Sequence, residues 1–376
     1  AHADLRFQPL RQLLAVGPVD QLHHVLLAAH RHQRLFGHHH RLLARGEDEA
    51  GTREHAGAQV AAAAGAGGGG VTVAVIDSGI LADHPSLNGQ LLAGYDMLSA
   101  PNNLRGDRSP DFRPDERDSR CGQRLVSGAF RTHGTEVASL IAGNGADGVL
   151  GVNPSAKILP IRLFGACSMS RSDLLDAISW SAGLPVAGVP PNPHPARIIN
   201  MSIAGGLTSC GADLQQVINR VLDKKVFVIA AAGNNFHKPL PEPANCKGVI
   251  SVGAVDAENK IEVYSALDAR TTLYAPGGGK RLSANADWAV NKLKVATYDL
   301  DLMGQERPSA LFRGVGTSYA APVVAGFVSL WLSHYPDKRP SDFVKEMPKF
   351  LRQVEPIEQC PDCNPKGVTA ASGINP

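Results

Sequence analysis

The strongest constraint on the fold is a repeated alternation of apolar, β-branched segments with helical segments from residue 71 onward. The first, Val71–Ile76, is an almost unbroken apolar run, as expected for a strand covered on both faces of a parallel sheet. Alternating strands and helices predict a three-layer α/β fold, in which helices cover both faces of a doubly wound, mostly parallel sheet. The expected strands are residues 71–76, 157–163, 197–203, 226–231 and 249–255, and the expected helices are 136–142, 172–181, 212–222, 317–333 and 340–352.

Composition restricts the classes of partner. Apolar residues make up 43% of the chain, which is enough for a buried core, and the formal net charge is only +2. A chain without a strongly basic surface does not indicate binding to nucleic acid or to an anionic membrane. No apolar run reaches the roughly 18 residues of a membrane-spanning helix. We therefore expect no nucleic-acid partner, no membrane partner and a monomer.

Residues 1–70 differ from the rest of the chain. They contain nine of the fourteen histidines, lack Lys, Ser, Ile and Cys, and end in runs of Ala and Gly. They show neither a clean helical or strand periodicity nor the pattern of a signal peptide. Three interpretations remain open: a natural pro-segment or linker, GC-rich DNA translated in a non-native frame, or a His-rich metal-binding tract. We expect a poorly ordered leader at 1–70 and one folded domain at 71–376, with a short tail from about residue 353.

Three polar residues lie where such a fold places its chemistry, at strand ends and helix starts. Asp77 directly follows the first strand, His133 lies in the segment 132–135, and Ser318 lies in the segment 316–322 that opens the late helix. Taken singly, they are a turn residue, a surface residue and a helix cap. Taken together, with glycines beside each, they match one of the known chain orders for an orienting Asp, a His base and a nucleophilic Ser.

With these three segments the sequence resembles the subtilisin-like serine proteases, over about residues 70–340, and residues 188–202 resemble a secreted bacterial branch of them. The resemblance implies a subtilisin-like fold and a secreted or periplasmic serine endopeptidase that acts through an acyl-enzyme. Asp77, His133 and Ser318 would be its triad, and Asn234 would complete the oxyanion hole. Polypeptides would be the substrates, and the chain's own propeptide could act as an inhibitor.

The same resemblance assigns substrate binding to two segments, one of which would bind the peptide by β-augmentation. The implied substrate-binding residues are Ser202, Ile203, Ala204, Gly205, Ala231, Ala232 and Gly233.

Four residues bear on how closely the chain follows the family pattern. Glu136 replaces a frequent second His and Tyr319 replaces the usual Met, and we expect both changes to be tolerated because neither residue is a catalytic group. Ala204 replaces a Gly, and its methyl group could narrow the pocket for P1, the substrate residue before the cleaved bond. Glu242, near the pocket base by resemblance, could favour a basic P1 residue or could be a solvated loop carboxylate.

The six cysteines favour disulfides, because an even number in a secreted hydrolase is typical of a disulfide framework. The chain lacks the two Cys-x-x-Cys units that would indicate a structural zinc site. Six cysteines allow fifteen pairings. The resemblance implies the pairs Cys121–Cys167, Cys210–Cys246 and Cys360–Cys363.

The family also implies structural calcium. The polar excursion between residues 97 and 130 carries Asp107, Asp111 and Asp115 as candidate ligands, since calcium prefers carboxylate oxygens. A solvated acidic loop explains them equally well.

Other function classes fit the sequence less well. An α/β-hydrolase esterase requires Gly-x-Ser-x-Gly, but residue 320 is Ala. The run 67–70 lacks the Gly-Lys-Ser/Thr of a phosphate-binding loop. The remaining alternative is a protease-like binding protein without activity.

Overall fold

The computed structural model describes residues 70–349, except 101–106, 115–128, 165–168, 206, 236–238, 257–259, 280–292 and 301–305, together with 352–353 and 369–370. Almost all of the expected leader and most of the expected tail therefore lie outside the described residues.

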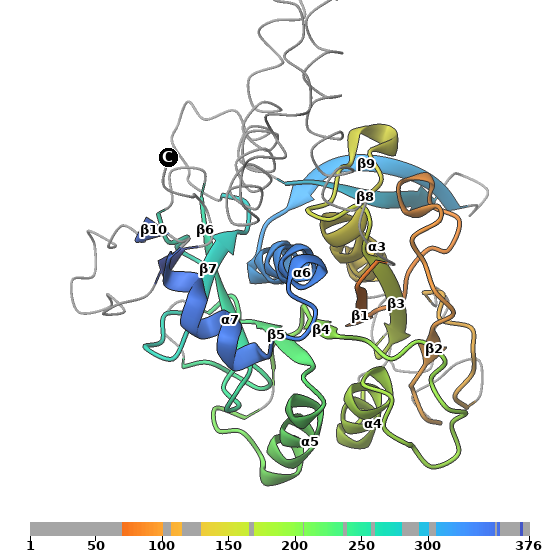
Figure 1. Ribbon diagram of the computed structural model, residues 1–376. Helices are drawn as coiled ribbons and strands as arrows, with labels where there is room; N and C mark the ends of the chain where they lie inside the picture. Colours follow the sequence, from red (N-terminus) through yellow and green to blue (C-terminus); the bar gives the residue numbers. More distant parts are fainter. Residues whose placement is uncertain are drawn as a thin grey trace, which may run out of the picture.

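A nine-stranded sheet in the order β10-β11-β7-β6-β5-β4-β1-β3-β2 forms the centre of the structure (Figure 1). All neighbours pair in parallel except β10 and β11. The strand order reverses at β1, which pairs with β3 on one side and β4 on the other, so the crevice expected at such a switch point lies at the carboxyl ends of β1 and β4. The strands are β1 (Thr72–Asp77), β2 (Tyr95–Asp96), β3 (Lys157–Arg162), β4 (Ile198–Met201), β5 (Phe227–Ala231), β6 (Ile250–Val255), β7 (Leu273–Pro276), β10 (Arg352–Gln353) and β11 (Thr369–Ala370).

Each face of the sheet has its own hydrophobic core. Successive side chains of β1 point to opposite faces: Val73 and Val75 pack with α3 (Ala129–Ala142), α6 (Thr317–His334) and α7 (Pro340–Glu346), whereas Ala74 and Ile76 pack with α4 (Arg171–Ser181) and α5 (Ala212–Asp223). Both faces are covered, which explains the unbroken apolar runs of the strands and confirms the expected three-layer α/β fold (Figure 1).

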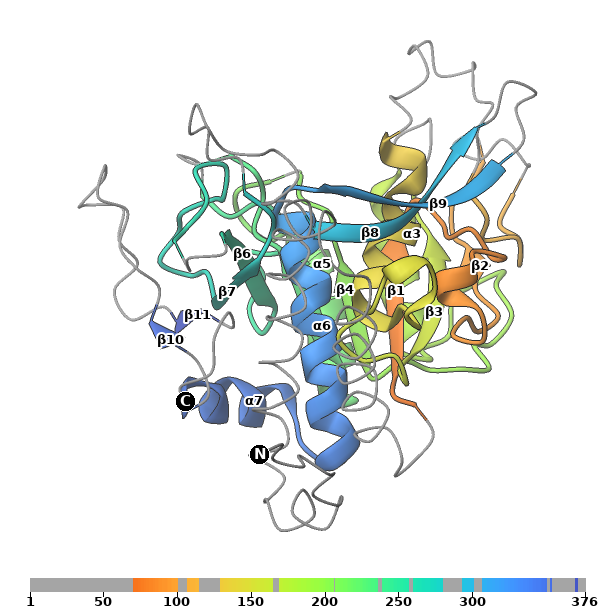
Figure 2. The same ribbon diagram turned by 90° about the horizontal axis from the view of Figure 1, so that it is seen from above.

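Helix α6 runs through the middle of one layer (Figure 2) and is buried along most of its length. Pro322 lies inside it and has no N–H to donate to the carbonyl of Ser318, four residues earlier. The Oγ of Ser202, just after β4, donates to that carbonyl instead, at 2.7 Å. The sheet thereby fixes the first turn of α6.

A two-stranded antiparallel hairpin of β8 (Leu293–Leu300) and β9 (Glu306–Gly314) lies beside α3 (Figure 2) and was not expected from the sequence. Leu293 and Val295 of β8 pack against Leu140 of α3 and the ring of Tyr319. Short 3-10 helices at Pro85–Leu87, Ala146–Gly148 and Met347–Lys349 complete the described elements.

Two expected helices have different bounds in the structure. The helix expected from residue 136 begins at Ala129, so His133 lies inside α3 rather than before it. The helix expected over 340–352 ends at Glu346, where a 3-10 turn follows. None of the helices within the described residues is both long and apolar enough to span a bilayer.

Candidate active site

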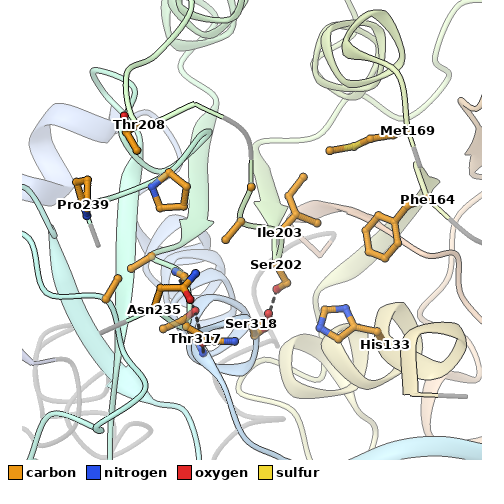
Figure 3. Close-up of a pocket in the computed structure, with 17 residues that line it drawn as sticks. His133, Phe164, Met169, Ser202, Ile203, Thr208, Asn235, Pro239, Thr317 and Ser318 are labelled. Carbon is orange, nitrogen blue, oxygen red and sulfur yellow. Dashed lines mark hydrogen bonds between the residues drawn. The ribbon is translucent and has the colours of Figure 1, made fainter. Parts of the chain in front are cut away.

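A cavity of about 660 Å³ opens at the carboxyl edge of the sheet (Figure 3). His133 of α3 and Ser318 of α6 both line it. Most of the expected substrate-binding residues line it too, namely Ser202, Ile203, Ala204, Gly205, Ala232 and Gly233. Ala231 is fully buried in β5 and is not part of the lining.

Asp77 lies behind His133, at the end of β1. The His133 Nδ1 atom is 2.9 Å from Asp77 Oδ1 and 3.0 Å from Oδ2, so Nδ1–H is the donor and Nε2 is left unprotonated in the neutral ring. The N–H of Ser78 also donates to Asp77, at 2.7 Å. The Asp77 side chain is 1% exposed and that of His133 is 13% exposed. Asp77 therefore fixes the imidazole tautomer that a general base needs.

The electrostatic surroundings of His133 favour its charged form. Burial lowers the pKa of the imidazole, but the charge of Asp77, its hydrogen bond and the charge of Glu136 together raise it by more. The net pKa lies above the usual range for histidine.

Gly134 allows α3 to approach β1 this closely. A Cβ atom at this position would lie 2.2 Å from the Gly79 carbonyl oxygen and 3.2 Å from Asp77 Cβ. The Gly134 N–H donates to Ser78 Oγ at 3.1 Å. The Gly after His133 is thus required by the contact between base and carboxylate.

Ser318 is the second residue of α6, after the cap Gly316, and not the helix cap itself. The N-terminal amides of a helix favour a developing negative charge. No hydrogen bond joins Ser318 and His133, two described residues, and such bonds are often long before substrate binds.

Asn234 is oriented by the residue before Ser318. Its Oδ1 accepts hydrogen bonds from the N–H and the Oγ of Thr317, both at 2.9 Å. The amide Nδ2 therefore remains as a donor in a residue that lines the cavity. Gly316 has φ +148°, and a Cβ there would lie 3.1 Å from Asn234 Nδ2, so glycine is needed beside this amide.

Glu136 and Tyr319, which both differ from the family pattern, are in contact with each other, and the sequence did not indicate this. The Tyr319 hydroxyl donates to Glu136 Oε2 at 2.5 Å. The hydroxyls of Thr132 and Thr297 donate to Oε1 at 2.6 and 3.0 Å. Only the pairing of two unusual residues in motifs far apart in the chain could have suggested this cluster.

The described lining of the cavity is mostly apolar. Ala204 is exposed and belongs to this lining. His133 is the one titratable residue in the described lining. The cavity therefore suits an uncharged side chain.

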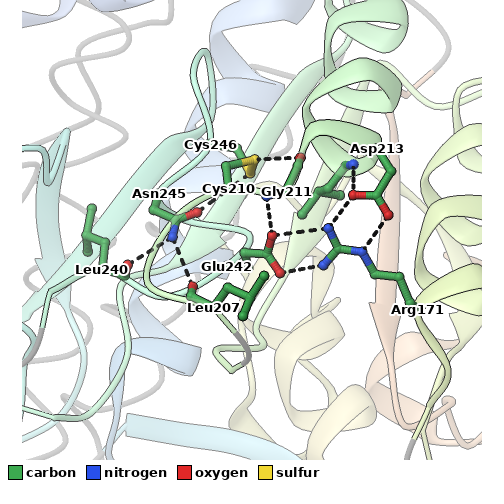
Figure 4. A network of polar contacts seen from close by, with 10 residues as sticks. Arg171, Leu207, Cys210, Gly211, Asp213, Leu240, Glu242, Asn245 and Cys246 are labelled. Atoms are coloured by element: carbon green, nitrogen blue, oxygen red, sulfur yellow. Dashed lines mark hydrogen bonds and ion pairs between the residues drawn. A yellow bond between two sulfur atoms is a disulfide. The ribbon is translucent and has the colours of Figure 1, made fainter.

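The interpretation of Glu242 as a solvated loop carboxylate was wrong. Its side chain is 5% exposed, is not among the residues that line the cavity and forms an ion pair with Arg171 (Figure 4). It also accepts the Gly211 N–H at 2.7 Å, and Arg171 binds Asp213 at 2.6 Å. The charge of Glu242 is therefore paired with that of Arg171 inside the protein rather than solvated.

The structure contains the expected disulfide Cys210–Cys246, with a Cα–Cα distance of 5.0 Å. It joins the start of α5 to the loop after β5 (Figure 4). The pairs Cys121–Cys167 and Cys360–Cys363 lie outside the described residues.

The described carboxylates in and beside the polar excursion contact neighbouring protein groups. Asp111 pairs with the guanidinium two residues later, and buried Asp96 pairs with Arg162. The carboxylate of Asp107 accepts the next backbone N–H at 2.7 Å. No group of three His, Cys, Asp or Glu side chains in the described residues could hold a metal ion. Asp115 lies outside those residues.

Comparison with known proteins points to one family. The model of the subtilase family matches residues 68–354. The chain is 38% identical over 275 residues to an extracellular basic protease of Dichelobacter nodosus and 36% identical over 267 residues to an extracellular protease of Xanthomonas campestris pv. campestris. These alignments cover 70% and 69% of the chain but 43% of each relative, so the chain spans less than half the length of both.

Solved structures agree with the sequence relatives. A protease from Pseudoalteromonas arctica superposes with a TM-score of 0.69 at 32% identity, over 83% of this chain and 91% of that one. A cold-adapted subtilisin-like serine proteinase superposes with a TM-score of 0.57 at 20% identity, over 82% of this chain and 90% of that one, which is a likeness of fold alone.

Proposed function

Because the chain belongs to the subtilase family, we propose that it is a serine endopeptidase that uses Asp77, His133 and Ser318. The observation that carries this proposal is the cavity lined by both His133 and Ser318, with buried Asp77 bonded to the far side of the imidazole.

The proposed chemistry begins at Ser318. Its Oγ attacks the scissile carbonyl carbon while His133 Nε2 accepts the hydroxyl proton. Asp77 stabilises the imidazolium that forms, in agreement with the raised pKa of His133. The same proton then passes to the leaving amine, and water reverses the sequence to release the acyl group.

The oxyanion would accept a hydrogen bond from Asn234 Nδ2 and lie near the N-terminal amides of α6. Support comes from the contact of Thr317 with Asn234 Oδ1, which directs the amide nitrogen away from that contact. Preorganised donors of this kind are worth about a hundred- to a thousand-fold in turnover.

We also propose an uncharged, apolar P1 residue and secretion of the protein. The described cavity wall has apolar residues and no acidic or basic group beyond His133. Secretion is supported by the disulfide Cys210–Cys246 and by relatives named extracellular proteases.

The decisive experiment compares the full chain with Ser318→Ala. We expect the wild type to hydrolyse casein and to be labelled stoichiometrically by an organophosphonate, and the variant to do neither. Equal caseinolysis by both proteins would refute the assignment. A folded wild type that is neither labelled nor active would instead support a binding protein of this fold.

A further inference from the structure

A buried polar cluster beside the proposed catalytic residues has no part in their assigned chemistry. It consists of Glu136, Tyr319, Thr132 and Thr297 and is called the Glu136 cluster below. Glu136 is 2% exposed and Thr297 fully buried. The three hydroxyls that donate to the carboxylate come from α3, β8 and α6. The cluster thus ties together three elements at the edge of the active site.

The distances indicate strong bonds. The hydroxyls of Tyr319 and Thr132 lie 2.5 and 2.6 Å from the carboxylate oxygens of Glu136, in the range of hydroxyl donors to a charged acceptor. A buried carboxylate that loses one of these donors loses part of what compensates it for leaving water. The phenol of Tyr319 is therefore held firmly.

Tyr319 connects this anchor to the proposed base. Its ring contacts the imidazole of His133 edge-on, with centroids 5.8 Å apart and an interplanar angle of 65°, a favourable geometry for two aromatic rings. It is also the residue next to Ser318 in the first turn of α6. One side chain therefore touches the base, follows the nucleophile and is bonded to the helix that carries the base.

We propose that Glu136 and Tyr319 act as a pair of positioning residues, in which the carboxylate fixes the phenol and the phenol holds His133 in the orientation that accepts the Ser318 proton. The inference rests on the proposed function and extends it to two residues that do not touch the substrate.

The first test is Tyr319→Phe in the full chain, with a peptide anilide that carries an apolar P1 residue. The ring stays and one hydroxyl is lost, so we expect kcat to fall about tenfold, as small misplacements of reacting groups cost rate, with KM within about twofold. Tyr335→Phe makes the same change just beyond the far end of α6 and should leave both constants unchanged. Phosphonate titration gives the concentration of competent sites in each sample.

The second test uses pH. Because the charge of Glu136 raises the pKa of His133, Glu136→Gln should move the acid limb of the kcat/KM profile to lower pH, whereas Tyr319→Phe should leave the limb near its wild-type position. The kcat of the double variant should be little lower than that of the more impaired single variant, since both substitutions remove the same Tyr319–Glu136 hydrogen bond.

Two results would overturn the proposal. One is a Tyr319→Phe enzyme with wild-type kcat per titrated site. The other is a double variant whose loss of kcat equals the product of the two single losses, because independent effects would mean that Glu136 and Tyr319 do not act as a pair. If Tyr319→Phe does not fold, Thr297→Val removes another donor while keeping the ring, and unchanged kcat in that variant is equally damaging. Absence of labelling in the wild type would refute the proposed function instead.

Discussion

At the scale of single residues, the site depends on which atom of each polar group is already occupied. Asp77 occupies His133 Nδ1 and leaves Nε2, and Thr317 occupies Asn234 Oδ1 and leaves Nδ2. In both cases a buried partner selects the atom that faces the cavity. The geometry therefore orients the proposed base and the proposed oxyanion donor before any substrate binds.

Asp77→Asn tests whether the bond from His133 Nδ1 to Asp77 fixes the imidazole tautomer. An amide in place of the carboxylate can donate to Nδ1 and favour the wrong tautomer, so kcat should fall by about 10⁴. In the wild type, kcat/KM should fall as pH drops through the raised pKa of His133. A stopped assay across pH 5–9 measures both effects. Asp223→Asn, an exposed carboxylate at the end of α5, is the matched control. Retention of more than a tenth of the activity in Asp77→Asn would contradict this role.

The sequence could indicate the three residues of the proposed triad because each lies in a local motif with a recognisable role. It could not predict the Glu136 cluster, because its members come from segments far apart in the chain and each has an unremarkable interpretation alone. The same reason explains the error at Glu242: its loop position was visible, but its ion pair with Arg171 depends on packing.

At the scale of elements, the sequence predicted the central strands and the long helices because their apolar patterns are strong. It missed β8 and β9, since this hairpin packs against α3 and its strands gain their burial from that non-local contact. It also began α3 too late, because the polar residues and Gly134 around His133 interrupt the apolar pattern before residue 136. Boundaries that depend on tertiary packing are weakly encoded in local sequence.

The two loops that contribute Thr208 and Pro241 to the cavity lining are held together by two different crosslinks. The disulfide Cys210–Cys246 joins them covalently, and Arg171 bridges Glu242 to Asp213 (Figure 4). The hydrogen bonds from Arg171 lower the pKa of Asp213 to about 2. The stabilisation of the folded state by this carboxylate is therefore present above its unfolded pKa near 4 and is lost as pH falls toward 2.

Replacing both cysteines tests the covalent crosslink. Cys210→Ser with Cys246→Ser should lower the free energy of unfolding by about 2–4 kcal/mol, because the loop of 36 residues is no longer closed in the unfolded chain. KM for peptides should rise more than kcat falls, since this loop supports the substrate wall. Urea unfolding and steady-state kinetics provide the two measurements. A reducing agent is a poorer test, because it also acts on the four other cysteines. A stability loss below about 1 kcal/mol would show that the ionic bridge suffices.

At the scale of the whole molecule, α6 links catalysis to the core. It begins at the proposed nucleophile and ends in an aromatic group formed with Phe227 of β5 and Phe343 of α7 around Trp331. Trp331 is 2% exposed and its ring centroid lies 5.3 Å from that of Phe343. Because the same helix spans both regions, folding of the segment that carries Ser318 depends on a core far from the cavity.

Trp331→Ala tests whether the core end of α6 affects the stability of the protein without affecting the activity of the folded site. Loss of a buried indole should lower the free energy of unfolding by about 3–5 kcal/mol. Because Trp331 lies more than three turns from Ser318, the activity per phosphonate-titrated site should remain within about twofold while the protein is folded. Val344→Ala, at a position 40% exposed on α7, should change stability by no more than about 0.5 kcal/mol. Urea unfolding followed by circular dichroism and by activity should give coincident transitions in the wild type. A variant with wild-type stability, or a folded variant with inactive titrated sites, would contradict the view that α6 transmits packing to the site only through folding.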